Sequence, residues 1–173
     1  EVTGFERDVM DQVCSRAALS CSWELANFDQ LIPGVIAGRF DVILGGIAVT
    51  DDRRMLVDFT DPYHGTDQNE WYIGRPGAST PAEALVAVQS GTVQEAHLRK
   101  MGYRHISYPT EPQVLEALIA GVADLALGPF GTRRDIAAFV DGNGLGSLYT
   151  EAIPDDGVGM AVCKGNGTLL ASL

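Results

Sequence analysis

The sequence predicts an α/β protein built from two related lobes. Residues 35–45, Val-Ile-Ala-Gly-Arg-Phe-Asp-Val-Ile-Leu-Gly, are echoed by residues 118–128, Leu-Ile-Ala-Gly-Val-Ala-Asp-Leu-Ala-Leu-Gly. Each copy reads as the end of an amphipathic helix, a glycine suited to a left-handed helix end, a two-residue link and a short apolar strand. In open α/β sheets, ligands bind beyond the carboxyl ends of the strands. Two such lobes facing each other would therefore frame a cleft.

The amino-acid composition excludes several classes of protein. The chain has 173 residues, is 46% hydrophobic and carries a net charge of −11, with only 12 Lys and Arg. This length and hydrophobic content are sufficient for a packed core, and they exclude disordered and fibrous proteins. A nucleic-acid partner is not expected, because nucleic-acid binding requires a basic stripe. No apolar run approaches the roughly 20 residues that span a bilayer, and the first residues do not resemble a secretory signal.

The first lobe is expected to begin with a helix between Phe5 and Leu19, where apolar residues recur at helical spacing. Asp29 is a suitable N-cap for a second helix ending near Ala37. Thr50 is placed to cap a short helical turn at 51–55. Strands of this lobe are expected at 23–26, 41–46 and 158–163.

The second lobe is expected to follow an extended stretch at 67–73 and a turn-rich stretch at 74–79. Thr92 and Glu95 have the spacing of a capping box, which predicts a helix ending near residue 101. Thr110 and Gln113 are interpreted as a second box, opening a helix at 114–120. The remaining expectations are strands at 85–88 and 124–127, a helix at 132–139, and a return to the first lobe through 149–156. The predicted lobes are 1–67 with 155–173, and 68–154.

Arg53 is the most pointed candidate for ligand binding. It falls in the first turn of a helix, where the macrodipole disfavours a cation, just after the strand-end pair Gly45-Gly46. Together with the N–H groups of that turn, its guanidinium would provide hydrogen-bond donors for a carboxylate. The alternative is that Arg53 is simply neutralised by a nearby acid, namely Asp51, Asp52 or Asp58.

In the other lobe, the turn Gly91-Thr92-Val93 presents N–H groups at a helix start and suits an anion, or is an ordinary capping box. Phe28 is either a core residue or a ring at the cleft mouth. Cys14 and Cys21 flank a helix end, and their spacing fits either a disulfide or two buried thiols.

No motif supports an enzyme or a metal site. The chain lacks a Gly-x-Ser-x-Gly elbow, a phosphate-loop lysine and paired histidines. Asp155 and Asp156 are interpreted as solvated charges in a turn. Cys163 is expected to be a small core residue.

Several segments carry a resemblance to a known family. They are, in order, 4–9 (Gly-Phe-Glu-Arg-Asp-Val), 28–33 (Phe-Asp-Gln-Leu-Ile-Pro), 38–43 (Gly-Arg-Phe-Asp-Val-Ile), 50–54 (Thr-Asp-Asp-Arg-Arg), 57–63 (Val-Asp-Phe-Thr-Asp-Pro-Tyr), 91–95 (Gly-Thr-Val-Gln-Glu) and 121–124 (Gly-Val-Ala-Asp). The chain resembles periplasmic solute-binding proteins, family 3, of polar amino-acid ABC transporters, close in pattern to lysine/arginine/ornithine- and histidine-binding proteins. The resemblance implies a two-lobed periplasmic-binding-protein type II fold with two hinge strands, truncated at both ends.

By this resemblance, Arg53 grips a ligand α-carboxylate, Thr92 and Val93 donate to the same group, and Phe28 is a platform for the ligand side chain. The resemblance also favours the disulfide between Cys14 and Cys21.

The same comparison raises a question about the ligand nitrogen. Gly46, Ala48 and Pro129 stand where relatives place hydroxyl residues and an acid that meet the ligand ammonium. A carboxylate ligand without a free ammonium, or with its nitrogen met by another acid, therefore fits better.

The implied function is an extracytoplasmic solute-binding protein that closes on an amino acid or related small carboxylate. Its expected partners are that ligand and an ABC transporter permease, and it is expected to be a monomer without a cofactor. Its expected location is periplasmic, or extracellular with a lipid anchor as in some relatives. The alternatives are a ligand-sensing domain of a membrane receptor or kinase, and a periplasmic dehydratase-type enzyme on the same fold.

Overall fold

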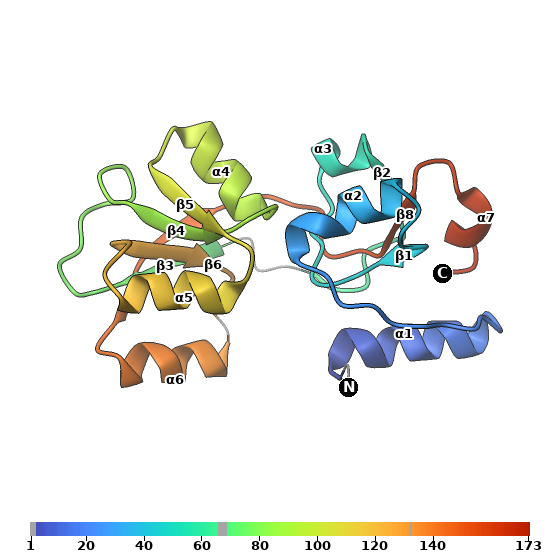
Figure 1. Ribbon diagram of the computed structural model, residues 1–173, viewed down its shortest axis with the longest axis horizontal. Helices are drawn as coiled ribbons and strands as arrows, with labels where there is room; N and C mark the ends of the chain where they lie inside the picture. The colour runs from blue at the N-terminus through green and yellow to red at the C-terminus, as the bar shows by residue number, and fades with distance from the viewer. Residues whose placement is uncertain (1–2, 66–68, 132) are drawn as a thin grey trace. The chain divides into compact units, whose positions relative to one another are not determined.

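The computed structural model describes residues 3–65, 69–131 and 133–173. The chain divides into two compact units, labelled by their helices and strands in Figure 1. Unit 1 comprises Glu1–Thr66 and Asp155–Leu173, and unit 2 comprises Asp67–Pro154. The lobe boundary that the sequence places between residues 67 and 68 lies outside the described residues. Within the described part of the chain, none of the helices combines the length and apolar character that crossing a bilayer requires.

Unit 1 is built around a small antiparallel sheet of order β1-β8-β2. Its strands are β1 (Val42–Ile43), β2 (Val57–Phe59) and β8 (Ala161–Cys163). The central strand therefore comes from the end of the chain, and Val162 pairs with both Val42 and Asp58. The helical elements of this unit are α1 (Phe5–Arg16), the 3-10 turn η1 (Phe28–Gln30), α2 (Leu31–Ile36), α3 (Asp51–Arg54) and α7 (Gly167–Leu170).

Two apolar clusters hold unit 1 together. One is formed by buried residues of α2, the sheet and the chain between β1 and α3, among them Val35, Ile47 and Val57. The other attaches α1 through Met10 and Cys14. Cys14 also forms a disulfide with Cys21, which ties the end of α1 to the segment that follows.

Several expectations for unit 1 are wrong in detail. Residues 23–26 form no strand, because no neighbouring strand in the described chain provides a hydrogen-bonded ladder for them. The strand expected at 41–46 is only Val42–Ile43, and the one expected at 158–163 is Ala161–Cys163. Asp29 does not cap α2, since it lies inside η1. Cys163, expected to be a small core residue, is half-buried and packs against the cluster that contains Val35 and Ile47.

Unit 2 contains a five-stranded sheet of order β5-β4-β6-β3-β7. Strand β4 runs parallel to β5 and β6, whereas β3 runs antiparallel to β6 and β7. The strands are β3 (Asn69–Gly74), β4 (Val86–Gln89), β5 (His105–Tyr108), β6 (Leu125–Gly128) and β7 (Gly146–Ala152). The helices are α4 (Val93–Met101), α5 (Glu111–Ile119) and α6 (Arg134–Gly142).

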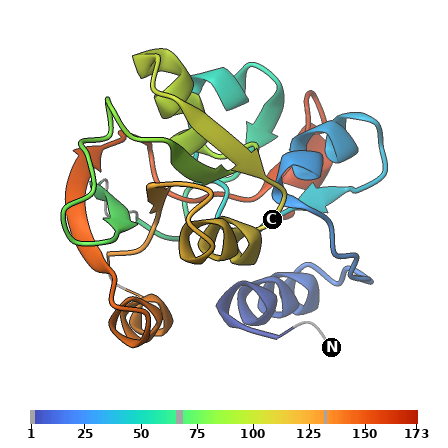
Figure 2. The same cartoon turned by 60° about the vertical axis from the view of Figure 1, so that its left-hand side comes forward.

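Both faces of this sheet are covered. Ala87 packs in one cluster with residues of α5 and α6, while its neighbours Val86 and Val88 pack in another cluster with Leu98 of α4. Successive strand residues point to opposite faces, so α5 and α6 lie on one face and α4 on the other. Figure 2 shows these layers within unit 2 from a second direction.

The repeated segment forms the same local structure in both units. Gly38 follows α2 with φ +74°, and Gly121 follows α5 with φ +71°. Both glycines thus have the left-handed conformation that the sequence predicts, and the strands β1 and β6 follow them. This relationship is confirmed.

The two predicted capping boxes of unit 2 differ. Thr92 accepts a hydrogen bond from the Glu95 N–H, which confirms the first box. The second box is wrong, because the Thr110 hydroxyl donates to the Gln113 side chain and caps no backbone group. Thr110 is nevertheless the N-cap residue, and α5 begins directly after it at Glu111, earlier than expected. The helix expected at 132–139 spans Arg134–Gly142, and residue 132 itself lies outside the described residues.

Candidate functional site

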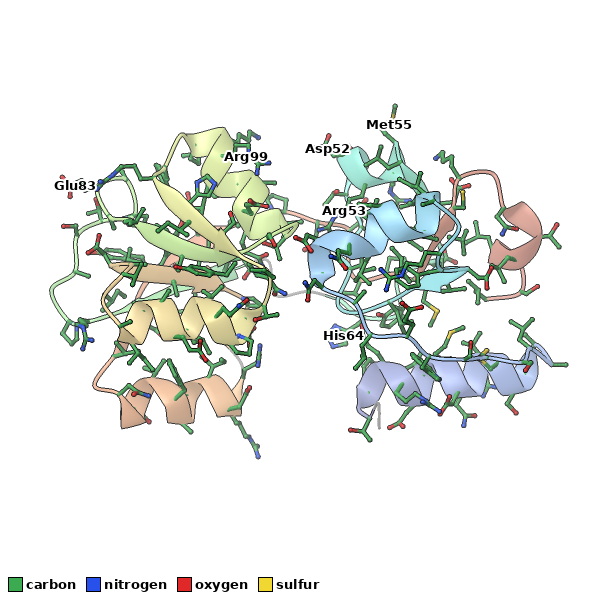
Figure 3. All side chains as sticks on the ribbon, in the orientation of Figure 1. Asp52, Arg53, Met55, His64, Glu83 and Arg99 are labelled. Atoms are coloured by element: carbon green, nitrogen blue, oxygen red, sulfur yellow. A yellow bond between two sulfur atoms is a disulfide. The ribbon has the colours of Figure 1, made fainter. Side chains whose placement is uncertain are left out.

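Arg53 is a buried cation in unit 1. It is the third residue of α3, a short helix whose start is capped by Thr50, and only 8% of it is exposed. Its Nη1 donates a hydrogen bond to the carbonyl oxygen of Ala48 at 2.8 Å. Figure 3 labels Arg53 beside its exposed neighbours Asp52 and Met55. The short helix thus directs one side chain inward, where its guanidinium is held by the backbone.

The surroundings of Arg53 set its electrostatics. Burial lowers the pKa of Arg53 below its ordinary value, and the carboxylate of Asp155 opposes this shift. The guanidinium carbon lies 5.6 Å from the centre of the Phe28 ring, within the range of a cation–π contact. An arginine stays charged in such a setting. Unit 1 therefore contains a buried positive charge that is stacked on an aromatic ring and oriented by a carbonyl.

The acid beside Arg53 differs from those that the sequence suggested. Asp51 and Asp52 are exposed, and Asp58 is paired with Lys164 at 2.8 Å. Asp155 is half-buried and interacts with Arg53, so its interpretation as solvated turn charge is wrong. Asp155 is brought there because the chain around Val158 pairs with the chain around Ala48.

The glycine pair before Arg53 is tied to α1. Gly45 and Gly46 have φ values of +143° and +67°, a conformation that favours glycine. The Gly46 N–H donates to Glu6 at 2.7 Å, and the Tyr63 hydroxyl donates to the same carboxylate. Burial, with Glu6 as its hydrogen-bond partner, raises the pKa of Tyr63. The N–H of Gly46 is therefore already used inside the protein.

The start of α4 is the candidate site in unit 2. The Thr92 hydroxyl donates to the carbonyl of Gln89 at 2.7 Å and accepts from the Glu95 N–H at 3.2 Å. Glu95 in turn accepts from the Gly91 N–H at 2.8 Å. Within the described residues, no backbone carbonyl accepts a hydrogen bond from the N–H groups of Val93 and Gln94. These two donors remain open at a helix start, where acceptors are favoured.

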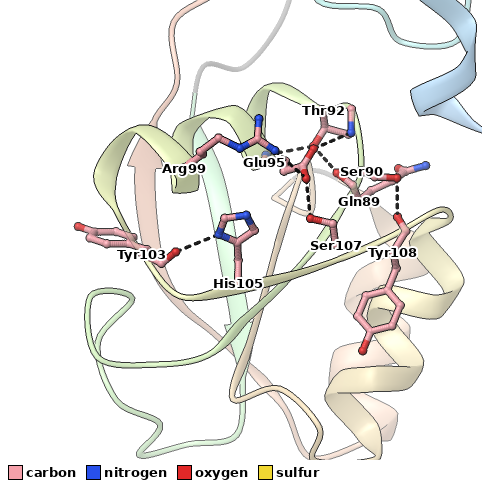
Figure 4. A network of polar contacts seen from close by, with 10 residues as sticks. Gln89, Ser90, Thr92, Glu95, Arg99, Tyr103, His105, Ser107 and Tyr108 are labelled. Atoms are coloured by element: carbon pink, nitrogen blue, oxygen red, sulfur yellow. Dashed lines mark hydrogen bonds and ion pairs between the residues drawn. The ribbon is translucent and has the colours of Figure 1, made fainter. Parts of the chain in front are cut away.

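Glu95 also connects α4 to the sheet, as Figure 4 shows. Ser107 donates to it at 2.6 Å, and Arg99 lies 3.1 Å from the same carboxylate oxygen. Burial raises the pKa of Glu95, but hydrogen bonds from Ser107 and Gly91 and the charge of Arg99 outweigh burial, and the net pKa is lowered. Glu95 is thus a structural carboxylate that fixes the Thr92 turn.

A small cavity lies beside this turn, wholly within unit 2. Its volume is about 20 Å³, which admits a water molecule or one small ligand group. The lining residues come from the ends of β4 and β6 and the first turns of α4 and α5: Gln89, Thr92, Gln94, Glu111, Val114, Leu127, Gly128, Pro129 and Phe130.

Within unit 1 the structure brings together Arg53, Phe28 and Ala48 from the sequence-predicted set, and Gly46 lies in the turn just before Ala48. Within unit 2 it brings Thr92 and Pro129 to one cavity. Val93 packs its side chain against the core cluster that contains Leu98, so only its backbone N–H is open.

Sequence reasoning missed Gln89, Gln94 and Glu111 as cavity residues. No sequence signal marked Gln94, because its burial follows from the packing of α4 against the sheet. For a metal there is no candidate cluster among the residues that the structure describes.

Comparison with known proteins places the chain in a family. The L-arginine-binding protein of Pseudomonas aeruginosa is 28% identical over 184 residues, covering 98% of this chain and 70% of that protein. The lysine/arginine/ornithine-binding periplasmic protein of Escherichia coli is 28% identical over 135 residues, covering 73% of this chain and 52% of that protein. The chain therefore spans only about half the length of the second relative.

Two solved structures show the same fold. A periplasmic His/Glu/Gln/Arg/opine family-binding protein from Silicibacter pomeroyi, in complex with lysine, has a TM-score of 0.86 at 29% identity, covering 99% of this chain and 78% of that one. A periplasmic binding protein of Salmonella typhimurium with high arginine specificity has a TM-score of 0.87 at 23% identity, with 99% and 80% covered. The type II periplasmic-binding-protein fold expected from the sequence is confirmed.

The sequence profile described as bacterial extracellular solute-binding proteins, family 3, matches residues 1–170, which is nearly the whole chain. The chain belongs to this family.

Proposed function

We propose that the protein is an extracytoplasmic solute-binding protein of an ABC transporter, and that it binds an amino acid or a related small carboxylate through Arg53. The carrying observation is the buried guanidinium, stacked on Phe28 and oriented by the Ala48 carbonyl. Burying a charge costs free energy, and a ligand carboxylate would offset that cost with charge-assisted hydrogen bonds. The names of the relatives, which are arginine- and lysine-binding proteins, support the same ligand class.

A second candidate binding site, within unit 2, is the start of α4. The open N–H groups of Val93 and Gln94 and the capping Thr92 suit an acceptor group of the ligand. The expectation that both units serve one ligand stays a prediction. A permease partner, the monomeric state and periplasmic location are parts of the same proposal.

The ligand nitrogen has few acceptors in these two regions. The Ala48 carbonyl accepts from Arg53. Pro129 has no side-chain acceptor, and Gly46 has no side chain. These features favour a ligand whose nitrogen is substituted or absent, or one whose nitrogen is met by another acid such as Asp155, which lies beside Arg53, since a buried ammonium without a counter-charge is costly.

A thermal-shift screen tests the proposal. The probes are plain amino acids, their N-acetyl derivatives and simple organic acids. A ligand at about 100 times its dissociation constant adds about 2.7 kcal/mol to native-state stability. Stabilisation by any carboxylate probe supports the proposed class, and a preference for N-acetyl forms supports the substituted nitrogen. The absence of stabilisation by every probe would contradict the proposal.

A further inference from the structure

The sequence contains two Asn-Gly pairs, Asn143-Gly144 and Asn166-Gly167, and both asparagines are exposed. The amide of an asparagine that precedes glycine can be attacked by the glycine backbone nitrogen, because glycine has no side chain to hinder the approach and rotates freely. The two pairs share this chemistry, but Asn143 lies at the end of α6 and Asn166 at the start of α7. The structure therefore distinguishes the consequences of modifying them.

Asn143 closes the last turn of α6 with its side chain. Its Nδ2 donates a hydrogen bond to the carbonyl oxygen of Phe139 at 2.8 Å, and its backbone N–H donates to the same oxygen at 3.1 Å. Val140 before it and Leu145 after it are buried in one apolar cluster of unit 2. The side-chain amide thus holds the point at which the chain leaves α6 and returns to the core.

The backbone around Asn143 leaves room for the attack. Asn143 has φ −110° and ψ 10° and lies outside the regular helix, and Gly142 precedes it. The Gly144 N–H makes only a long hydrogen bond, 3.4 Å to the carbonyl of Asp141. Helix ends open locally at low cost. The Gly144 nitrogen can therefore leave its acceptor and approach the side-chain carbon Cγ of Asn143.

We propose that Asn143 is a site of spontaneous deamidation, and that this modification weakens the contact that ends α6. The Gly144 nitrogen forms a bond to Cγ of Asn143, the bond from Cγ to Nδ2 breaks, and Nδ2 leaves as ammonia with the proton of the Gly144 N–H. Water then adds to either carbonyl of the resulting succinimide and opens the ring, giving aspartate or isoaspartate. Each product carries a carboxylate, whose proton passes to solvent, in place of the amide.

Both products are unfavourable at this position. A carboxylate cannot donate to the Phe139 carbonyl, and the helix macrodipole disfavours a negative charge at the C-terminus of α6. Isoaspartate also adds an atom to the main chain just before the buried Leu145. At Asn166 the side-chain oxygen is an acceptor, bonded by the Leu169 N–H at 3.3 Å, and aspartate caps a helix start as well as asparagine does. Asn166 is therefore the matched control.

Mass spectrometry of the aged native protein tests whether Asn143 reacts. The protein is held folded in mildly alkaline buffer and then digested with trypsin. Cleavage after Arg134 and Lys164 yields the peptides 135–164 and 165–173, and each contains one asparagine, Asn143 in the first and Asn166 in the second. The peptide 135–164 should progressively exchange an amide for a carboxylic acid and appear in aspartate and isoaspartate forms.

Thermal melts and hydrogen exchange of the variants test the consequence. Asn143→Asp should lower the melting temperature by about 2–4 °C, the shift expected for the loss of one hydrogen bond in a chain of this size, and should speed amide exchange at the end of α6. Asn166→Asp should leave the melting temperature unchanged. Asn143→Gln, whose longer side chain cyclises poorly, should keep its melting temperature on ageing, while that of the native protein falls.

The inference is overturned if the peptide 135–164 keeps its amide in the aged native protein. It is also overturned if Asn143→Asp and Asn166→Asp melt at the same temperature with equal exchange at the end of α6.

Discussion

Arg53 and Ala48 are joined by a hydrogen bond of 2.8 Å from the guanidinium Nη1 to the backbone carbonyl oxygen. The acceptor lies in the chain leading into α3, five residues before the arginine, so a local loop fixes the direction of the side chain. This bond has a second effect, because it occupies a carbonyl close to the proposed carboxylate site. The same contact that orients the cation reduces the acceptors open to a ligand ammonium.

Arg53→Ala should abolish most of the affinity for a carboxylate ligand. Removing one partner of a buried charge pair costs about 2–5 kcal/mol of binding free energy. Arg54→Ala is the matched control, since Arg54 is exposed and reaches Asp156 only at 3.4 Å on the surface. Titration calorimetry on both variants, with thermal melts to verify folding, makes the comparison. Equal affinities for the Arg53 and Arg54 variants would remove Arg53 from the site.

Thr92→Ala should destabilise the protein by about 1 kcal/mol, because it removes the N-cap of α4. Thr110→Ala should have a clearly smaller effect, since Thr110 occupies the equivalent place at α5 but its side chain caps no N–H. Denaturant unfolding of the two variants measures the difference. Thr92→Ser, which retains a capping hydroxyl, should recover most of the loss. A Thr110 effect as large as the Thr92 effect would show that capping is not the cause.

The sequence was sufficient where a feature depends on neighbours in the chain. The left-handed Gly38 and Gly121 follow from a helix end, and the Thr92 box follows from a side chain three residues before Glu95. The same local rule failed at Thr110, because its hydroxyl bonds a side chain instead of the helix backbone. The local sequence shows that a capping box is possible. Which hydrogen-bond partner the threonine hydroxyl takes depends on the groups that the fold places around it.

Features that depend on distant parts of the chain were not predictable. Asp155 reaches Arg53 only because the chain around Val158 pairs beside Ala48. Residues 23–26 have the composition of a strand, yet a strand needs a partner ladder, and the described chain supplies none there. The burial of Gln94 likewise depends on how α4 meets the sheet.

Cys14→Ser combined with Cys21→Ser should lower the free energy of unfolding by about 2 kcal/mol. The disulfide closes a short loop, with a sequence separation of 7, so its effect on the unfolded chain lies at the low end of the usual range. A reducing agent should lower the melting temperature of the native protein and leave that of the double variant unchanged. Cys163→Ser, which changes a free thiol, provides the control and should keep the sensitivity to reduction. Loss of that sensitivity in the Cys163 variant would contradict the assigned pairing.

Glu95 should make the protein's stability depend on pH. Its side chain is only 13% exposed. Burial raises its pKa, but the hydrogen bonds from Ser107 and Gly91 and the charge of Arg99 lower the pKa by a larger amount. The folded-state pKa therefore lies below the ordinary value of 4.5. A carboxyl whose pKa is lowered by folding stabilises the folded state when it is ionised. That contribution is complete above the ordinary pKa and is lost as the pH falls through the lowered one.

Glu95→Gln should therefore be less stable than the native protein at neutral pH, and the difference should shrink as the pH falls below 4.5. Denaturant unfolding of both proteins across this range measures it. Glu116→Gln, at an exposed position of α5, is the control and should change the unfolding free energy at neutral pH by less than about 0.5 kcal/mol. If the difference in unfolding free energy between Glu95→Gln and the native protein does not change as the pH falls below 4.5, the charge of Glu95 is not what stabilises the contact between α4 and β5.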